Sequence, residues 1–168
     1  RGGSKRIPKK NIKIFFGKPI IYWSIKTAQK TKLFDRIIVS TDSNKIAKIA
    51  KCYGAEVPFM RSKKLSDDKT GTSEVVVNLI NWLKSKGYNP SNVCCINATA
   101  PFIQVKDIIK GYKKLKSKNW QYVFSASKYD YPLQRSFGLL KNEGIKMLFP
   151  KYYNYNSQKL HQMYHDAG

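Results

Sequence analysis

The sequence predicts an α/β fold built on a mostly parallel sheet that helices cover on both faces. Two short apolar runs, RIIVS at 36–40 and VCCI at 93–96, have the composition of buried strands, and a helical pattern follows each of them. This alternation is typical of βα units. The 168 residues, 42% of them hydrophobic, suit one domain, so a single domain is expected over 1–168.

Turn and cap residues set the expected bounds of the elements. Pro19 suits the first turn of a helix, the segment 41–43 (TDS) offers the N-cap of the next, and Gly54 and Gly87 are placed to end helices. The expected elements are, in order, a helix over 19–30, a strand over 36–40, a helix over 44–53, a strand over 55–57, a helix over 73–86, a strand over 93–96, a helix over 105–117 and a strand over 122–125. Residues 129–168 hold more than half of the 11 tyrosines but little periodicity, so a hairpin or an irregular lid is expected there.

The net charge is +22, from 32 Lys and Arg against 10 Asp and Glu. Such a balance can mark a nucleic-acid-binding domain, which remains the alternative from a different class. However, the basic residues are spread along the chain, and those at 113–118 suit a solvated helix face. Trp23, Trp82 and Phe124 lie in apolar patterns and are expected in the core, not among exposed basic residues. A lysine-rich composition is therefore the preferred explanation, and small polyanionic substrates come second.

The cysteines give no sign of a metal site or of a disulfide framework. Cys52, Cys94 and Cys95 form no CxxC or Cys/His pattern, and buried free thiols in a reducing compartment explain them. The sequence shows neither an apolar stretch long enough for a membrane nor a signal peptide, so a cytoplasmic location is expected.

Three loops are expected where a parallel sheet of this kind binds ligands, at the carboxyl ends of strands: 1–11, 60–72 and 97–101. In the first loop, glycines would let backbone N–H groups approach a phosphate, and Arg1 and Lys5 would supply positive charge. The loop has neither the Walker A nor the GxGxxG spacing, and a solvated basic loop would look similar.

Several segments in order along the chain resemble the CMP-acylneuraminate synthetase (cytidylyltransferase) family, and the resemblance covers essentially the whole chain. They are RGGSK with a later KN at 1–11, FDRIIVSTD at 34–42, RSKKLSDDKTGT at 61–72, CINATAPF at 95–102 and YHDAG at 164–168. Together with YGAEVPFMR at 53–61, they are most similar to the branch that activates pseudaminic acid.

The resemblance implies the fold and the reaction. The fold would be the Rossmann-like nucleotide-diphospho-sugar transferase fold, three-layered around a mostly parallel sheet. The reaction would be attack by a sugar hydroxyl on the α-phosphorus of CTP, with Mg²⁺ as cofactor. The products would be pyrophosphate and a CMP-sugar for surface glycans or flagellin. Pseudaminic acid is the expected sugar, with N-acetylneuraminate and legionaminate as alternatives, and a homodimer is expected.

The resemblance also implies site residues. The nucleotide would be bound by Arg1, Gly3, Ser4, Lys5, Asn11, Arg61, Thr70 and Thr72, and the sugar by Asn97, Thr99, Gln158 and Asp166. Arg1 and Lys5 would be catalytic, and Lys5 would stabilise charge on the α-phosphate in the transition state. No metal ligand is assigned, because the metal-binding D-x-D segment of the family is expected beyond residue 168. Asp67 and Asp68 are expected to form an ion-pair cluster with neighbouring lysines, and neither His161 nor His165 is assigned a catalytic role.

Four positions depart from the family pattern and leave the sugar and the level of activity open: Ser62, Asn97, Asn156 and Lys159. Both ends of the sequence are expected to be cut. The chain opens on Arg1 and a glycine pair and stops right after the Tyr-His-Asp-Ala cluster. The first strand and the C-terminal part would then be missing, and this segment alone is expected to be inactive, with 129–168 serving as a lid, a dimerisation region or a sugar-site region.

Overall fold

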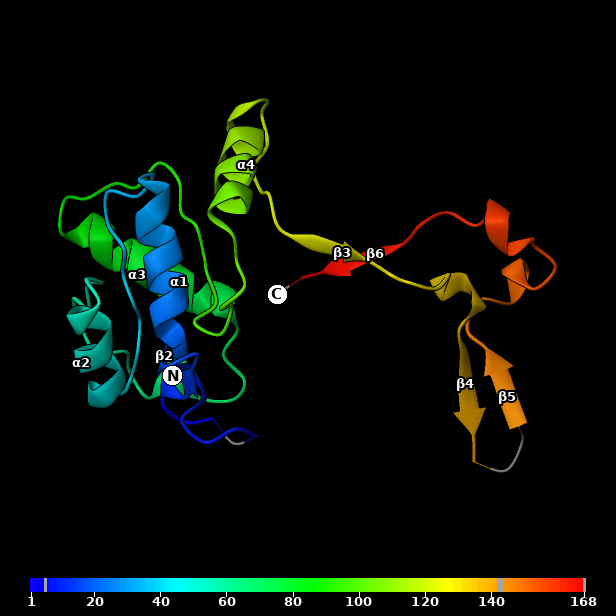
Figure 1. Ribbon diagram of the computed structural model, residues 1–168, viewed down its shortest axis with the longest axis horizontal. Helices are drawn as coiled ribbons and strands as arrows, with labels where there is room; N and C mark the ends of the chain where they lie inside the picture. The colour runs from blue at the N-terminus through cyan, green and yellow to red at the C-terminus, as the bar shows by residue number, and fades with distance from the viewer. Residues whose placement is uncertain (5, 142–143, 168) are drawn as a thin grey trace. The chain divides into compact units, whose positions relative to one another are not determined.

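The computed structural model describes residues 1–4, 6–141 and 144–167, and the chain forms two compact units, Arg1–Lys113 and Lys114–Gly168 (Figure 1). The described helices are α1 (Ile20–Thr31), α2 (Asn44–Cys52), α3 (Thr72–Ser85) and α4 (Val105–Lys116), the last of which crosses the boundary between the units. The described strands are β1 (Ile14–Phe15), β2 (Lys18–Pro19), β3 (Ala126–Lys128), β4 (Phe137–Leu140), β5 (Gly144–Met147) and β6 (Tyr164–Asp166). The chain is therefore mixed α/β, as predicted.

All four predicted helices are present, each within one residue of its expected bounds. The caps explain this agreement. The Ser43 hydroxyl accepts a hydrogen bond of 3.4 Å from the Ile46 amide at the start of α2. Gly54 and Gly87 follow α2 and α3 with φ angles of +85° and +78°, a backbone conformation that glycine adopts without strain.

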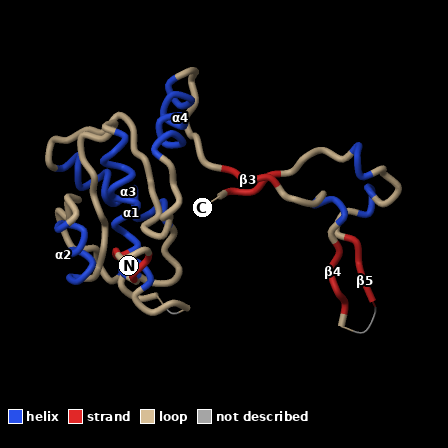
Figure 2. Tube along the Cα trace, in the orientation of Figure 1, coloured by secondary structure: helices blue, strands red, loops and turns tan. Residues whose placement is uncertain are grey.

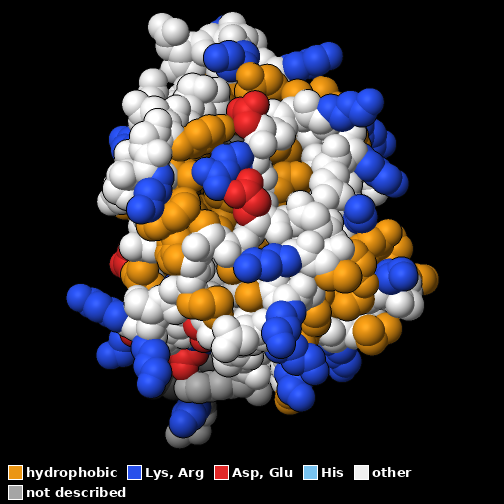
Figure 3. Space-filling model, turned by 90° about the vertical axis from the view of Figure 1, so that its left-hand side faces the viewer, with side chains coloured by type: hydrophobic (Ala, Val, Ile, Leu, Met, Phe, Trp, Pro, Cys, Tyr) orange, Lys and Arg blue, Asp and Glu red, His pale blue; other side chains and the backbone are white. Residues whose placement is uncertain are grey.

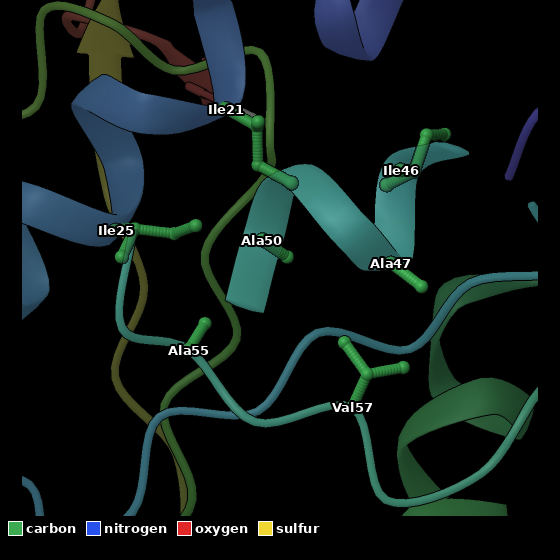
Figure 4. Packing of buried hydrophobic residues seen from close by; sticks show 7 residues of the cluster. All are labelled: Ile21, Ile25, Ile46, Ala47, Ala50, Ala55 and Val57. Atoms are coloured by element: carbon green, nitrogen blue, oxygen red, sulfur yellow. The ribbon is translucent and has the colours of Figure 1, made fainter. Parts of the chain in front are cut away.

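The core of the first unit lies between α1, α2 and the extended chain that follows α2. Its buried side chains, drawn in Figure 4, are Ile21, Ile25, Ile46, Ala47, Ala50, Ala55 and Val57. Ala50 is completely buried, and its small side chain allows α2 to pack closely. The apolar face predicted for the first helix is the face that α1 turns into this core.

Two extended segments run parallel beside this core. The Val39 amide donates to the Glu56 carbonyl at 2.8 Å, and the Glu56 amide donates to the Ile37 carbonyl at 2.8 Å. Further along, the Arg61 amide donates to the Thr41 carbonyl, also at 2.8 Å. The pairing amounts to two isolated parallel bridges, Ile38 with Glu56 and Thr41 with Met60. The predicted strands over 36–40 and 55–57 thus pair as a βα unit requires, although over a short length.

The predicted strands over 93–96 and 122–125 are not formed in the described chain. Val93, Cys94 and Cys95 are exposed to solvent, so the predicted burial of the two thiols is wrong, as it is for the exposed Cys52. The sequence pattern showed only that the VCCI segment is apolar, and it could not show whether another strand pairs with it. No described strand does. The described strands form three two-stranded antiparallel sheets, β1–β2, β3–β6 and β4–β5 (Figure 2).

The aromatic residues predicted for the core also differ from expectation. Phe124 is 61% exposed and stacks on Tyr122 with a centroid distance of 5.6 Å, so its predicted burial is wrong. Trp23 and Trp82 are half-buried. The indole of Trp23 donates to the Phe15 carbonyl at 2.9 Å, because β1 and β2 form a short ribbon immediately before α1.

The second unit contains the predicted hairpin. In the β4–β5 pair, Phe137 lies opposite Met147 and Leu139 opposite Ile145, which places these four side chains on one face of the ribbon. Gln134 lies before the hairpin, is 1% exposed, and its side-chain amide donates to the His161 carbonyl at 2.9 Å.

None of the described helices is long and apolar enough to span a membrane.

Candidate nucleotide site

The first loop and the loop before α3 meet around a hollow of about 510 Å³. The hollow is lined by Arg1, Gly2, Gly3, Ser4, Pro8, Lys9, Ser66, Asp67 and Asp68. A glycine-rich segment therefore lies opposite a loop that contains both acidic and hydroxyl groups. Two of the three loops predicted to bind a ligand are thus brought together, although they are more than fifty residues apart in the sequence.

Arg1 joins the two loops directly. Its guanidinium donates to the Asp67 carbonyl, forms an ion pair with the Asp68 carboxylate, and lies 3.5 Å from the Ser66 carbonyl oxygen. The sequence predicted an ion-pair cluster for the acidic pair, and the structure places the Arg1 guanidinium, a partner that was not predicted, against Asp68. A cation predicted to hold a triphosphate is therefore already paired with an anion of the chain.

Asn11 supports the same loop from behind. Its side-chain amide donates to the Arg1 carbonyl at 2.9 Å, and the residue lies in the short 3-10 turn Lys10–Ile12. This contact fixes the direction of the backbone at Arg1, and the predicted contact of Asn11 with the base stays a prediction. Lys5, predicted to be catalytic, lies outside the described residues.

Asp67 organises the loop that carries Thr70. Its carboxylate accepts hydrogen bonds from the Thr70 hydroxyl and the Thr70 amide, both at 2.7 Å, and from the Lys69 amide at 3.0 Å. Hydrogen bonding from the Thr70 side chain, followed by that from the amide, lowers the pKa of the Asp67 carboxyl below its ordinary value. The Thr70 hydroxyl oxygen also lies 3.1 Å from the Lys64 carbonyl oxygen, and Thr72 is exposed at the first turn of α3.

Arg61 is half-buried beside these loops. Its Nε atom is buried and has no hydrogen-bond partner among the described residues. Burial lowers the pKa of the guanidinium from its ordinary value, the nearby Asp42 charge opposes that effect, and the Arg1 charge adds to it. The group remains charged at neutral pH, because arginine titrates far above it. A buried donor without a partner next to a second cation suits an anionic or polar ligand.

Asp42 is a site residue that the sequence analysis did not assign. Its Oδ1 accepts a hydrogen bond of 2.7 Å from the Gly2 amide. The sequence treated the segment 41–43 only as a helix cap, and Ser43 performs that role. An acidic residue two positions after a predicted strand, in a chain with only 10 acidic residues, was the signal that could have found it.

The residues predicted to bind the sugar fall in both units. The Asn97 carbonyl accepts a hydrogen bond of 2.9 Å from the Ser24 hydroxyl of α1. Thr99, two residues later in the chain, is half-buried. In the second unit, Gln158 is exposed in the 3-10 turn Ser157–Lys159, and Asp166 is exposed in β6. The predicted sugar contacts of these residues stay predictions.

Basic side chains are spread over the face drawn in Figure 3, and metal ligands do not cluster among the described residues. In the space-filling view of Figure 3, Lys and Arg side chains are distributed across the face, with hydrophobic side chains between them. Within the part of the chain that the structure describes, no three His, Cys, Asp or Glu residues gather where they could hold a metal ion. Asp67 and Asp68 are engaged within the loops, as described above.

Comparison with known proteins shows the family of this chain. The family model described as "Cytidylyltransferase" matches residues 1–160. The chain belongs to the cytidylyltransferase family. Two pseudaminic acid cytidylyltransferases of Campylobacter jejuni, of serotypes O:2 and O:23/36, are 44% and 42% identical to it over 100% of this chain and 72% of each relative. A CMP-N,N'-diacetyllegionaminic acid synthase of Legionella pneumophila is 37% identical over 61% of this chain and 44% of that relative.

Membership of the cytidylyltransferase family confirms the resemblance found in the sequence. The matched range contains both loops of the hollow, together with α1 to α4 and the hairpin. The likeness to the two Campylobacter proteins extends over the full chain, so it is not confined to a nucleotide motif.

Proposed function

We propose that this protein transfers a cytidylyl group from CTP to a nonulosonic acid, with pseudaminic acid as the sugar. A hydroxyl of the sugar attacks the α-phosphorus of CTP, the bond from that phosphorus to the bridging oxygen breaks, and pyrophosphate leaves. The product is a CMP-sugar for surface glycans or flagellin. The observation that carries the proposal is the shared hollow, which residues 1–4 and 66–68 line together.

The triphosphate is proposed to bind in this hollow. Arg1 and Ser4 line it, and the Gly2–Gly3 backbone permits the close approach that phosphate oxygens need. Arg1 would exchange its Asp68 partner for phosphate oxygens. Lys5 is proposed to stabilise the charge that builds on the α-phosphate.

The base is proposed to lie toward Arg61, Thr70 and Thr72. The unpartnered Nε of Arg61 offers a donor for an acceptor of the nucleotide. Hydroxyl and backbone groups around Thr70 and Thr72 can bond both the exocyclic amine and the ring acceptors of cytosine, and Asn11 would support the same contacts. The Asp67 hydrogen bonds keep Thr70 in one position, which reduces the ordering required when the base binds.

The choice of sugar is supported by the extent of the likeness. The relatives named for pseudaminic acid match all of this chain, whereas the relative named for a legionaminic acid matches 61% of it. Asn97, Thr99, Gln158 and Asp166 are the proposed sugar contacts. N-acetylneuraminate and legionaminate remain the alternatives that the experiment includes.

Four further features are proposed for this protein. The Rossmann-like three-layer arrangement is supported by the parallel pairing of 37–41 with 56–61. A homodimer is supported by the apolar hairpin face, on which Leu139 is 82% exposed, a side chain that a second copy would cover. Mg²⁺ would offset the triphosphate charge, although the described residues supply no cluster of ligands for it. A cytoplasmic location follows from the need for CTP.

A substrate panel tests the proposal. The full-length protein, with any residues that flank 1–168, is incubated with CTP, Mg²⁺ and one of three acids: pseudaminic, legionaminic or N-acetylneuraminic acid. Pyrophosphate release and the CMP-sugar are then measured. The highest kcat/KM is expected with pseudaminic acid. A higher kcat/KM with either of the other acids would contradict the assignment of the sugar. If no acid led to release of pyrophosphate, the assignment of the enzyme activity would be contradicted.

A further inference from the structure

We propose that Asp42 is a positioning residue that holds the two nucleotide loops in place relative to each other. The inference rests on the proposed function, because its consequence is the geometry of the CTP site. Asp42 itself is not proposed to touch the reacting atoms. It acts through Gly2 in the first loop and through Arg61 in the second.

The contact with the first loop is a short hydrogen bond to a charged acceptor. The Gly2 amide donates to Asp42 Oδ1 at 2.7 Å, which fixes the peptide plane at the beginning of the glycine pair. A Cβ atom at Gly2 would lie 3.0 Å from the Ser43 Cβ and 3.8 Å from Asp42 Oδ1. The glycine therefore rests directly against the segment that carries Asp42.

The contact with the second loop combines a backbone bond and a charge. The Arg61 amide donates to the Thr41 carbonyl at 2.8 Å, and Thr41 is 1% exposed. Beyond this bond, the Asp42 carboxylate lies close enough to favour the charged form of the Arg61 guanidinium. Adjacent residues of one segment thus hold both loops.

The segment is itself firmly attached to the core. Ser43 caps α2 through its hydroxyl, and Ala47 and Ala50 of the same helix are buried. Asp42 therefore lies immediately before the N-cap of a packed helix, which gives both loops a rigid support. The Arg1–Ser4 segment has no such support of its own, because it lies in no helix or strand.

The charge of Asp42 has a second consequence. The Arg1 and Arg61 charges act on each other unfavourably, since Arg1 lowers the pKa of Arg61. A carboxylate beside them offsets this repulsion in the free enzyme. The two cations can then stay close together until the phosphates of the nucleotide arrive. Removal of the carboxylate would both release the Gly2 amide and separate the two cations.

The test compares three variants of the full chain with the wild type. Asp42→Ala removes the acceptor and the charge, Asp42→Asn keeps an acceptor oxygen for the Gly2 amide, and Asp107→Asn on α4 is the matched control for loss of an exposed aspartate. We expect Asp42→Ala to raise the KM for CTP by about tenfold or more, the scale of one lost hydrogen bond to a charged group. Asp42→Asn should recover part of this loss, and Asp107→Asn should leave the KM unchanged.

Two further measurements separate positioning from folding and from the proposed function. The Gly2 amide proton, followed by NMR without nucleotide, should shift upfield in Asp42→Ala, and the KM for the sugar should change much less than that for CTP. The positioning role would be overturned by an unchanged chemical shift of the Gly2 amide proton or by an unchanged KM for CTP. It would also be overturned if the KM values for CTP and for the sugar rose equally in a variant with a lower melting temperature. A wild-type chain that does not use CTP would instead overturn the proposed function, and the Gly2 shift would still test the contact.

Discussion

Replacement of Gly54 by alanine should destabilise the first unit through two separate effects. Gly54 has a φ of +85°, and a Cβ atom there would lie 2.6 Å from the Gln29 side-chain nitrogen. The left-handed conformation costs an alanine about 1–2 kcal/mol. Gln29 must also move, which breaks its 2.9 Å hydrogen bond to the Tyr53 carbonyl and costs about 0.5–1.5 kcal/mol more. The expected loss is therefore about 1.5–3.5 kcal/mol.

Gly87 supplies the matched control for this prediction. It has a φ of +78°, but no atom lies within 4 Å of a Cβ placed there. Gly87→Ala should therefore lose only the conformational part, about 1–2 kcal/mol. In a Gln29→Ala background, Gly54→Ala should also cost only the conformational part of the free energy, because the hydrogen bond from Gln29 to the Tyr53 carbonyl is already absent.

The assay is urea unfolding followed by circular dichroism and by the fluorescence of the three tryptophans, of which Trp23 lies on α1. The free energy of unfolding is compared among wild type, the two glycine variants, Gln29→Ala and the double variant. A Gly54→Ala loss equal to that of Gly87→Ala, with no coupling to Gln29, would refute the reasoning. It would mean that the contact between α1 and the end of α2 carries no measurable energy.

Three further predictions concern catalysis, charge and core packing. Lys5→Ala should lower kcat by roughly 10²-fold with the fold intact, as expected for loss of a group that stabilises transition-state charge, and an unchanged kcat would show that Lys5 is a solvated loop residue. Hydrogen bonding from Arg36 lowers the pKa of Glu56, so this pair adds stability above the unfolded pKa of about 4.3 and loses it as the pH falls through the folded value. Glu56→Gln should accordingly lower the free energy of unfolding by about 0.2–1 kcal/mol near pH 7, and the wild type and the variant should become equally stable in acid. A loss of stability that does not depend on pH would contradict the Arg36–Glu56 ion pair. Ile25→Ala should cost about 2–5 kcal/mol in urea unfolding because Ile25 is 3% exposed, and a loss below about 1 kcal/mol would place it outside the core.

The sequence predicted the helices well because their signals are local. Ser43 and Gly54 mark the two ends of α2 through their own backbone and side-chain chemistry, which does not depend on distant residues. The strands depend on pairing with other segments. Residues 36–40 find a parallel partner near Glu56, whereas the equally apolar 93–96 has no described strand beside it and is largely exposed.

The same distinction applies to the candidate site. Composition and resemblance identified both loops, because glycine, arginine and threonine are recognisable in sequence. The partners of these residues were not predicted. The pairing of Asp68 with Arg1 was not predicted, and Asp42 was assigned to a helix cap but binds the Gly2 amide. Those pairings join segments about forty to seventy residues apart, and only the folded chain brings them together.

The central claim, that these loops form a site for CTP, is tested most directly by nucleotide binding. Isothermal titration of the full chain with CTP, UTP, ATP and GTP, each with Mg²⁺, gives four dissociation constants under one condition. CTP should bind at least about tenfold more tightly than the other three, a difference of about 1.4 kcal/mol, because Arg61, Thr70 and Thr72 are proposed to read cytosine. Equal affinity for all four nucleotides would contradict the account.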